Sequence, residues 1–177
     1  MSIRIIVTGG TFDKEYNELD GSLFFRKSHV AEMLRLGRCR LAVKVQTLLM
    51  IDSLFMTASH RRRILQACLA SPERHIVVTH GTDTMAETAK VLGPRIGDKT
   101  VVLTGAMVPY KFGSSDGLFN LGSALAFAQA LPPGVYVAMN GRCLSWREAR
   151  KDKERGVFLS APAFRRARAS AGRAISP

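Results

Sequence analysis

Two threonines, Thr11 and Thr82, stand directly after glycine at the ends of apolar, β-branched segments. Glycine allows a sharp backbone turn and a close approach to a ligand, so each hydroxyl can be presented at the end of a strand. A threonine hydroxyl becomes an effective nucleophile only when a neighbouring group takes its proton. Side chains that could assist follow closely: Asp13, Lys14, Glu15 and Tyr16 after the first threonine, and Asp83 after the second.

Each glycine-threonine segment, taken alone, also has an ordinary structural explanation. Threonine and aspartate are common N-caps where a strand turns into a helix. Many nucleotide-binding proteins contain a Gly-Gly-Thr turn, but the G-x-G-x-x-G turn of a dinucleotide site is lacking after the first apolar segment. The chemical interpretation therefore depends on whether the fold brings the two threonines together.

The pattern of apolar residues predicts alternating strands and helices. Most of the strand-like runs are continuously apolar, which is typical of parallel strands buried on both faces. The sequence therefore predicts a doubly wound, mainly parallel α/β sheet with helices on both faces, Rossmann-like or flavodoxin-like. The predicted strands are Ile3–Thr8, Leu41–Leu49, His75–His80, Thr100–Thr104 and Val135–Met139, and the predicted helices are Ser28–Leu36, Ala58–Leu69, Asp83–Leu92 and Leu118–Leu131.

These elements form one predicted domain, residues 1–160. Proline and glycine end the helices at Ser71-Pro72, Gly93-Pro94 and Leu131-Pro132-Pro133-Gly134. The pattern is lost after about Ala161, so we expect residues 161–177 to be a basic C-terminal tail without fixed structure.

The predicted strand ends should gather in one place. In an open α/β sheet, ligands bind outside the carboxyl ends of the strands. Four of these ends carry small or hydroxyl-bearing residues, so we expect a single site there. A helix expected to begin near Asp83 would direct backbone N–H groups at that site and could stabilise an oxyanion. The four ends are Thr8–Thr11, Ile51–Ser53, Thr79–Thr84 and Thr104–Met107.

Composition narrows the remaining function classes. Hydrophobic residues make up 46% of the 177 residues, as in a globular protein, and no apolar run is long enough to span a bilayer. The N-terminal apolar segment is too short for a signal peptide, so we expect a cytoplasmic protein. The cysteines and histidines show no metal-ligand spacing, so we predict no metal and no cofactor.

The formal net charge of +12 is the one unusual bulk property. It permits non-specific attraction to nucleic acid. The arginines of His60–Arg63 and of Arg165–Arg173 are not interleaved with aromatic residues, so no base-stacking surface is indicated. Solvated surface is the simpler interpretation, and we expect no specific nucleic-acid partner.

Taken together, Thr8-Gly9-Gly10-Thr11 and His80-Gly81-Thr82-Asp83-Thr84-Met85 resemble the two signature segments of the L-asparaginase/glutaminase family. They lie about seventy residues apart. Thr104–Pro109, Ser115–Leu121 and Val137–Gly141 are also similar to that family, and the order and spacing match from residue 3 to about residue 153. The combination is far more specific than either glycine-threonine segment alone.

This resemblance implies two-step acyl transfer that converts L-asparagine to L-aspartate and ammonia. Thr11 matches the nucleophile of the family, and Thr82 and Asp83 match its second threonine and the neighbouring acid, which also receives the substrate ammonium. The family lysine that contacts this pair falls on Lys151, although a two-residue shift of register would place it at Lys153.

The resemblance also assigns residues around the nucleophile. Tyr16 is the only tyrosine soon after Thr11, although the gap is much shorter than is common in the family. Asp52 and Leu54, on either side of Ser53, depart from the family pattern, so recognition of the α-amino acid group should differ. The expected substrate-binding residues are Gly10, Asp52, Ser53, Gly81 and Ala106, with Ser53 holding the α-carboxylate and the Ala106 carbonyl meeting the amide nitrogen.

Typical members of that family carry a second, C-terminal domain of more than a hundred residues, whereas this sequence is similar to the first domain alone. It resembles a short, single-domain form, with the choice between asparagine and glutamine left open. The resemblance implies a homo-oligomer, either a dimer or a tetramer. We expect no association with a membrane.

Two other functions remain open at this stage. The chain could be the asparaginase-like subunit of a tRNA-dependent amidotransferase, since its positive charge suits RNA. It could instead be a non-catalytic amino-acid-binding module that keeps the fold without the chemistry. The presence of Thr11, Thr82, Asp83 and Lys151 together favours the amidohydrolase.

Overall fold

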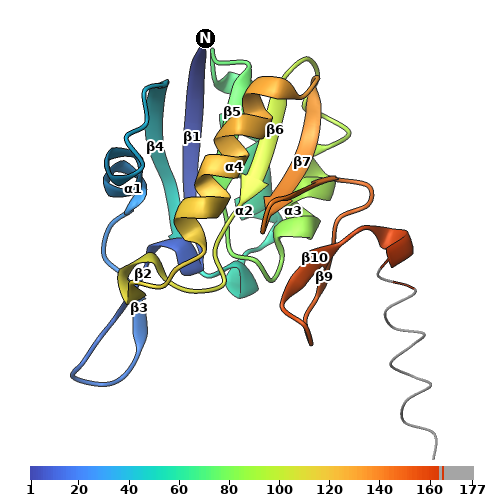
Figure 1. Cartoon of the computed structure of the whole chain (residues 1–177). Coiled ribbons are helices and arrows are strands. Elements are labelled where there is room, and N and C mark those ends of the chain that lie inside the picture. Colours follow the sequence, from blue (N-terminus) through green and yellow to red (C-terminus); the bar gives the residue numbers. More distant parts are fainter. Residues whose placement is uncertain (164, 166–177) are drawn as a thin grey trace, which may run out of the picture.

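In the computed structural model, which describes residues 1–163 and 165, the strands form one central six-stranded sheet and two small hairpins. The order in the central sheet is β4-β1-β5-β6-β7-β8 (Figure 1). Its first five strands are parallel and β8 runs antiparallel to β7. Their bounds are β1 Ser2–Gly9, β4 Ala42–Ile51, β5 His75–Thr79, β6 Thr100–Thr104, β7 Gly134–Met139 and β8 Arg142–Ser145.

The parallel strands have the flavodoxin-like order, in which the second parallel strand, β4, lies outside the first. The chain therefore reverses its direction of progress across the sheet between β1 and β5. In doubly wound sheets the ligand site lies at such a reversal, beyond the carboxyl ends of the two strands. The ends of β1 and β5 carry the two glycine-threonine turns.

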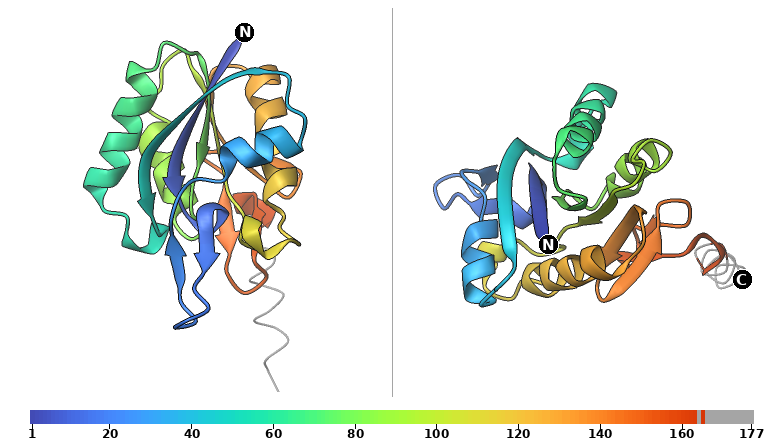
Figure 2. Two further views of the ribbon diagram at one scale, coloured as in Figure 1. Left: turned by 90° about the vertical axis from the view of Figure 1, so that its left-hand side faces the viewer. Right: turned by 90° about the horizontal axis from the view of Figure 1, so that it is seen from above.

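Helices cover both faces of the sheet, as the sequence predicts. On one face lie α2 (Ala58–Ala70) and α3 (Met85–Leu92), and on the other lie α1 (Val30–Leu36) and α4 (Gly117–Ala130). The view along the strands in Figure 2 shows the two helix pairs on opposite sides of the sheet. The predicted fold class is confirmed.

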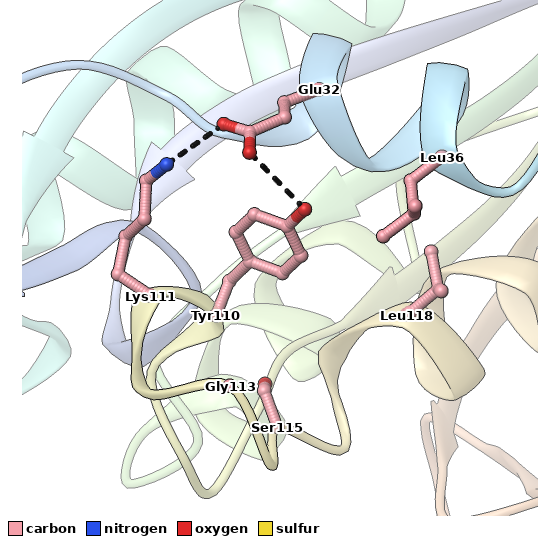
Figure 3. Close-up of a pocket in the computed structure, with 7 residues that line it drawn as sticks. All are labelled: Glu32, Leu36, Tyr110, Lys111, Gly113, Ser115 and Leu118. Carbon is pink, nitrogen blue, oxygen red and sulfur yellow. Dashed lines mark hydrogen bonds and ion pairs between the residues drawn. The ribbon is translucent and has the colours of Figure 1, made fainter.

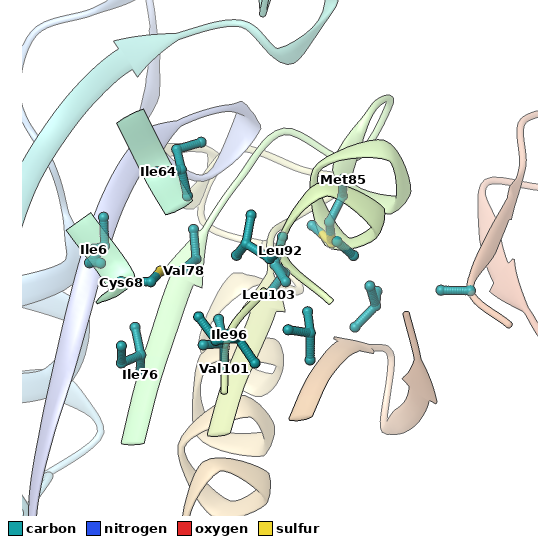
Figure 4. Close-up of a cluster of buried hydrophobic side chains, with 14 of the residues drawn as sticks. Ile6, Ile64, Cys68, Ile76, Val78, Met85, Leu92, Ile96, Val101 and Leu103 are labelled. Atoms are coloured by element: carbon teal, nitrogen blue, oxygen red, sulfur yellow. The ribbon is translucent and has the colours of Figure 1, made fainter. Parts of the chain in front are cut away.

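Two buried clusters hold these layers together. Successive residues of β1 and β5 point to opposite faces, so Ile6 and Val78 pack with α2 and α3, whereas Val7 and Val77 pack with α1 and α4. Figure 4 shows the first cluster, where Ile64 and Met85 from the two helices meet the strand side chains. Because the central strands are buried on both faces, their carboxyl ends form a rigid base for the loops that follow.

The structure corrects two helix starts and adds elements that the sequence does not reveal. Helix α1 begins at Val30 rather than Ser28. Helix α3 begins at Met85 rather than near Asp83, because the Thr84 hydroxyl donates to the Ser53 carbonyl and residues 82–84 stay in a turn. Strand β8 and both hairpins are unpredicted, since strands of only three or four residues are too short to show a periodicity. The hairpins are β2 (Lys14–Tyr16) with β3 (Leu23–Phe25), and β9 (Arg150–Asp152) with β10 (Val157–Leu159).

The tail predicted for residues 161–177 falls almost entirely on residues 164 and 166–177, which lie outside the described part of the chain. Residues 161–163 are helical, so the domain boundary at residue 160 stays a prediction. Within the described residues, no helix is both long enough and apolar enough to cross a membrane.

Candidate active site

The loops after β1, β4 and β5 are packed against one another through glycine. A Cβ atom on Gly10 would collide with the backbone of Gly81, and one on Gly81 would lie 2.5 Å from Ser53 Oγ. Gly10 also has a φ of 81°, a conformation that disfavours other residues. Because Thr11 and Thr82 each follow one of these contacting glycines, the fold brings the two threonine turns together.

Thr11 begins the short 3-10 turn η1 (Thr11–Asp13), and its side chain is only partly buried. The turn is held by its backbone: Gly10 N–H donates to the Ile51 carbonyl, and Asp13 N–H donates to the Gly10 carbonyl, each at 3.1 Å. Among the described residues, the Thr11 hydroxyl forms no hydrogen bond with another side chain. The hydroxyl is therefore free to meet a substrate.

A buried lysine joins the second threonine to the neighbouring acid. Lys151 Nζ donates to Thr82 Oγ1 at 2.8 Å and to Asp83 Oδ1 at 2.7 Å. The Lys151 side chain is only 9% exposed, whereas that of Asp83 is 36% exposed. Hairpin β9–β10 carries Lys151 to this position, while Lys153 lies exposed in its turn. The predicted contact is present at Lys151, and its catalytic role stays a prediction.

Tyr16 lies at the end of β2 and is 54% exposed. Its hydroxyl is 3.8 Å from the point that a Cβ atom on Gly21 would occupy, so it lies beside the turn of hairpin β2–β3. Strand β2, which ends at Tyr16, lies at the same end of the sheet as the carboxyl end of β1 (Figure 1), and no hydrogen bond joins Tyr16 to Thr11 in the described part of the chain. The role of Tyr16 stays a prediction.

Ser53 and Asp52 occupy the loop after β4 in different ways. Ser53 is buried, and its Oγ atom has no hydrogen-bond partner although it lies against Gly81. Asp52 pairs with Lys14 at 2.5 Å and caps the Leu54 N–H. Burial opposes ionisation of Asp52, but these hydrogen bonds outweigh burial and hold its pKa below the usual value. The Ser53 hydroxyl is therefore without a hydrogen-bond partner in the part of the chain that the structure describes, whereas the two carboxylate oxygens of Asp52 already bind Lys14 and the Leu54 N–H.

The loop after β6 completes the site and depends on polar residues to which the sequence assigned no role. Ala106 is buried there, and the preceding Gly105 carbonyl accepts from Asn120 Nδ2 at 2.8 Å. Asp116 accepts from Met107 N–H at 2.9 Å and from Asn120 Nδ2 at 2.8 Å. Asn120 Oδ1 accepts from Asn140 N–H at 2.8 Å, which links the loop to the end of β7. Their presence in the Ser115–Leu121 and Val137–Gly141 segments was the available signal.

His80 is a second residue that the sequence did not single out. Its ring is fully buried, with Nδ1 2.8 Å from the Gly81 carbonyl and Nε2 2.8 Å from Thr88 Oγ1. Burial lowers the pKa of His80 to about 4, so the imidazole is neutral near pH 7. The ring thus fixes the carbonyl of Gly81, one residue before Thr82, against helix α3.

We expect this buried imidazole to make the protein less stable as the pH falls from about 6.5 to 4. The unfolded chain takes up a proton on His80 below its usual pKa of 6.5, whereas the folded chain takes it up only near 4. The pKa difference corresponds to about 3 kcal/mol of stability lost across that window. Denaturant unfolding of the wild type and of His80→Gln at pH 7 and pH 4.5 measures the loss.

The comparison with His80→Gln is needed because Asp13 acts in the opposite direction. Burial raises the pKa of Asp13 to about 6, so the folded protein gains stability when Asp13 is protonated. That contribution is common to both proteins and cancels in the difference. An equal pH dependence in wild type and variant would contradict the assignment to His80.

Among the described residues, no three histidine, cysteine, aspartate or glutamate side chains cluster as metal ligands. The described site consists instead of hydroxyl, carboxylate, ammonium and backbone groups. This donor set is suited to acyl transfer with a hydroxyl nucleophile and charged groups for orientation.

The fold and site therefore define an α/β protein with a two-threonine site at the reversal point of a doubly wound sheet. Residues 2–169 match the family model described as "Asparaginase, N-terminal", and the chain belongs to this family.

Individual relatives agree with this assignment. The chain is 32% identical over 144 residues to an L-asparaginase from Thermococcus kodakarensis, covering 78% of the chain and 44% of that protein. The solved structure of the thermostable L-asparaginase from the same organism superposes with a TM-score of 0.81 at 30% identity, covering 90% of this chain and 51% of that one. A probable cytoplasmic L-asparaginase from Campylobacter jejuni gives 0.74 at 32% identity, covering 84% and 49%. The chain thus spans about half the length of the relatives it matches.

Proposed function

We propose that the chain is an amidohydrolase that converts L-asparagine to L-aspartate and ammonia through a covalent intermediate on Thr11. The observation that carries the proposal is the pair of hydrogen bonds from Lys151 to Thr82 and Asp83, placed where the Gly10–Gly81 contact brings in the Thr11 turn. Membership of the family supports the reaction type. An amino-acid-binding module would not need a buried ammonium group beside a hydroxyl.

In the first step, the Thr11 hydroxyl oxygen attacks the side-chain amide carbon of asparagine. The C–N bond breaks, and the amide nitrogen leaves as ammonia with the proton that the hydroxyl gave up. In the second step, water attacks the ester, releases aspartate and returns a proton to Thr11. Both steps need a proton carrier near the reacting atoms.

Thr82 is suited to that task because of the way Lys151 binds it. The ammonium donates to Thr82 Oγ1, so the hydroxyl hydrogen of Thr82 can be directed at the reacting group or at water. Lys151 also offsets negative charge that develops during attack. Tyr16, the only tyrosine soon after Thr11, would help to orient or deprotonate the Thr11 hydroxyl.

Recognition of the amino acid would use the polar groups that remain free. The unpartnered Ser53 Oγ can donate to the substrate α-carboxylate, and the exposed side of Asp83 can accept from the ammonium. Gly10 and Gly81 allow the close approach, and the Ala106 carbonyl would accept from the amide nitrogen. Asp52, held by Lys14, would shape the pocket rather than contact the substrate.

We also propose that the protein acts in the cytoplasm as a homo-oligomer, a dimer or a tetramer. The name of the Campylobacter jejuni relative supports the location, and the family resemblance supports assembly. Size-exclusion chromatography with light scattering would measure the oligomer directly.

Ammonia release from L-asparagine, with L-glutamine in parallel, tests the proposed function. We expect turnover of asparagine by the purified wild-type protein, measured by a coupled glutamate dehydrogenase assay. A folded protein that binds asparagine without releasing ammonia would be a binding module instead, and the amidohydrolase proposal would be withdrawn.

A further inference from the structure

The proposed mechanism gives no role to two fully buried titratable residues, Asp13 at the end of the Thr11 turn and His29 just before helix α1. Asp13 and His29 are both within 1% of complete burial. In the described part of the chain, three of the six buried side-chain atoms without a hydrogen-bond partner belong to them: Asp13 Oδ2, His29 Nδ1 and His29 Nε2. Such atoms are costly and infrequent in folded proteins, so their concentration at one place needs an explanation.

Asp13 connects the Thr11 turn to the start of helix α1. Its backbone N–H donates to the Gly10 carbonyl at 3.1 Å, which closes the turn around Thr11. Its Oδ1 atom accepts from the backbone N–H of His29 at 2.8 Å. His29 in turn precedes α1, whose Val30 and Met33 are fixed in the core. The carboxyl group therefore links the Thr11 turn to a helix that is fixed in the core.

Charged groups from every neighbouring element face this pair. Glu15 Oε1 of β2 lies 3.2 Å from His29 Nε2, and Glu32 Oε2 of α1 lies 3.9 Å from Nδ1, but neither makes an aligned hydrogen bond. From the turn η3 (Tyr110–Phe112), the Tyr110 ring lies 5.8 Å from the His29 ring, and Lys111 pairs with Glu32 at 3.0 Å. Ser28 and Lys27 flank the pair from the chain before α1.

The outer side of this cluster opens to solvent. Figure 3 shows the Glu32 carboxylate between Lys111 and the Tyr110 hydroxyl at the wall of a pocket of about 320 Å³. The pocket reaches Glu32 and Tyr110 but neither Asp13 nor His29, so exchange of the Asp13 proton with solvent requires local opening around the turn.

We infer that Asp13, hydrogen-bonded to His29, is a positioning residue that holds the Thr11 turn in place, and that ionisation of the Asp13 carboxyl loosens the turn. The inference rests on the proposed function only for its effect on catalysis. The link between the carboxyl and the turn is a property of the fold and can be measured without activity.

The direction follows from burial. The ionised carboxylate leaves Oδ2 charged and unpartnered inside the protein, which favours conformations that expose it. Burial accordingly raises the pKa of Asp13 to about 6, although the hydrogen bond from His29 N–H and, to a smaller extent, the neighbouring Ser28 side chain act to lower it. Burial and Lys111 lower the pKa of His29, against Glu15 and Glu32, so the imidazole cannot offset the new negative charge near neutral pH.

Amide hydrogen exchange of Asp13, Lys14 and His29 tests the coupling. With a carboxyl pKa of 3.8 when exposed and about 6 when buried, opening of the turn becomes about tenfold more favourable between pH 5 and pH 7. We expect exchange rates, corrected for the intrinsic pH effect, to rise by that factor in the wild type and to stay level in Asp13→Asn. Asp20→Asn, an exposed change in the same hairpin, should keep the wild-type rise.

A corrected exchange rate that does not change between pH 5 and pH 7 in the wild type would overturn the inference. So would an equal rise of the exchange rate in Asp13→Asn. Should Asp13→Asn fail to fold, the wild type alone decides by NMR: the Asp13 carboxyl carbon and the Thr11 amide must titrate together near pH 6. Separate titrations would contradict the coupling.

Enzyme kinetics then separates positioning from binding. We expect Asp13→Ala to lower kcat for asparagine at least tenfold with less than a threefold change in KM, and Asp13→Asn to restore most of kcat. Wild-type kcat in a folded Asp13→Ala would overturn the positioning role. If the wild-type protein has no activity, the proposed function is wrong. The hydrogen-exchange result still tests whether the Asp13 carboxyl and the Thr11 turn are coupled.

Discussion

Replacing Thr11 by alanine abolishes ammonia release from asparagine, with kcat falling by about 10⁴-fold or more, as expected when a covalent nucleophile is removed. The Thr11 hydroxyl has no side-chain hydrogen bond in the described part of the chain and is only partly buried, so Thr11→Ala should fold normally. The initial rate of ammonia release measures the loss, and calorimetric titration with asparagine measures whether binding survives.

A matched threonine-to-alanine change separates this effect from general damage. Thr57 caps helix α2 by accepting from His60 N–H, and it is not one of the proposed site residues. Thr57→Ala should lower stability by about 1 kcal/mol and leave kcat unchanged. If Thr11→Ala keeps a turnover rate within tenfold of the wild type, Thr11 is not the nucleophile, and Thr82 becomes the candidate to test.

Lys151→Met is the second change with a large expected effect. Methionine keeps a long aliphatic side chain but removes the group that donates to Thr82 and Asp83, so we expect kcat to fall by about 10²–10³-fold. KM should change less, because Asp83 and Ser53 remain. Steady-state ammonia assays on asparagine give both constants.

Lys153→Met is the control for register and for charge. Lys153 lies two residues further along the same hairpin and is exposed. Its replacement by methionine removes the same positive charge as Lys151→Met. Its variant should behave like the wild type. Equal losses in the two variants would indicate a general electrostatic effect, and the hydrogen bonds of Lys151 would not then explain catalysis.

Much of the fold is predictable because its central strands are buried on both faces. Strand Thr100–Thr104 has the predicted bounds, and the helices differ from prediction by one or two residues at their ends. The hairpins are not predictable in this way, because strands such as Arg150–Asp152 are polar, short and stabilised by contacts distant in sequence. Hydrophobic periodicity contains no information about such strands.

The same distinction applies to the site. Thr11 and Thr82 can be located from glycine and strand ends, since the carboxyl ends of parallel strands share one edge. The position of Lys151 came only from family resemblance, because its hairpin has no sequence pattern of its own. Asp13 was considered only as one of several possible helpers of Thr11, and His29 and His80 were not assigned roles, since burial of a polar residue in a loop is a tertiary property. Only the packed structure shows which of them lack partners.

The place of β1 within the sheet determines when the sheet can form during synthesis. β1 is the first strand made but lies between β4 and β5, with Ile3 paired to Val43 on one side and to His75 on the other. A ribosome must therefore deliver residues up to Thr79 before β1 has both neighbours. Until then, apolar residues of β1 stay available to chaperones or to misassembly, as in other sheets built from contacts distant in sequence. The same chain reversal that gathers the two threonine turns thus lengthens the interval during which the nascent chain is vulnerable.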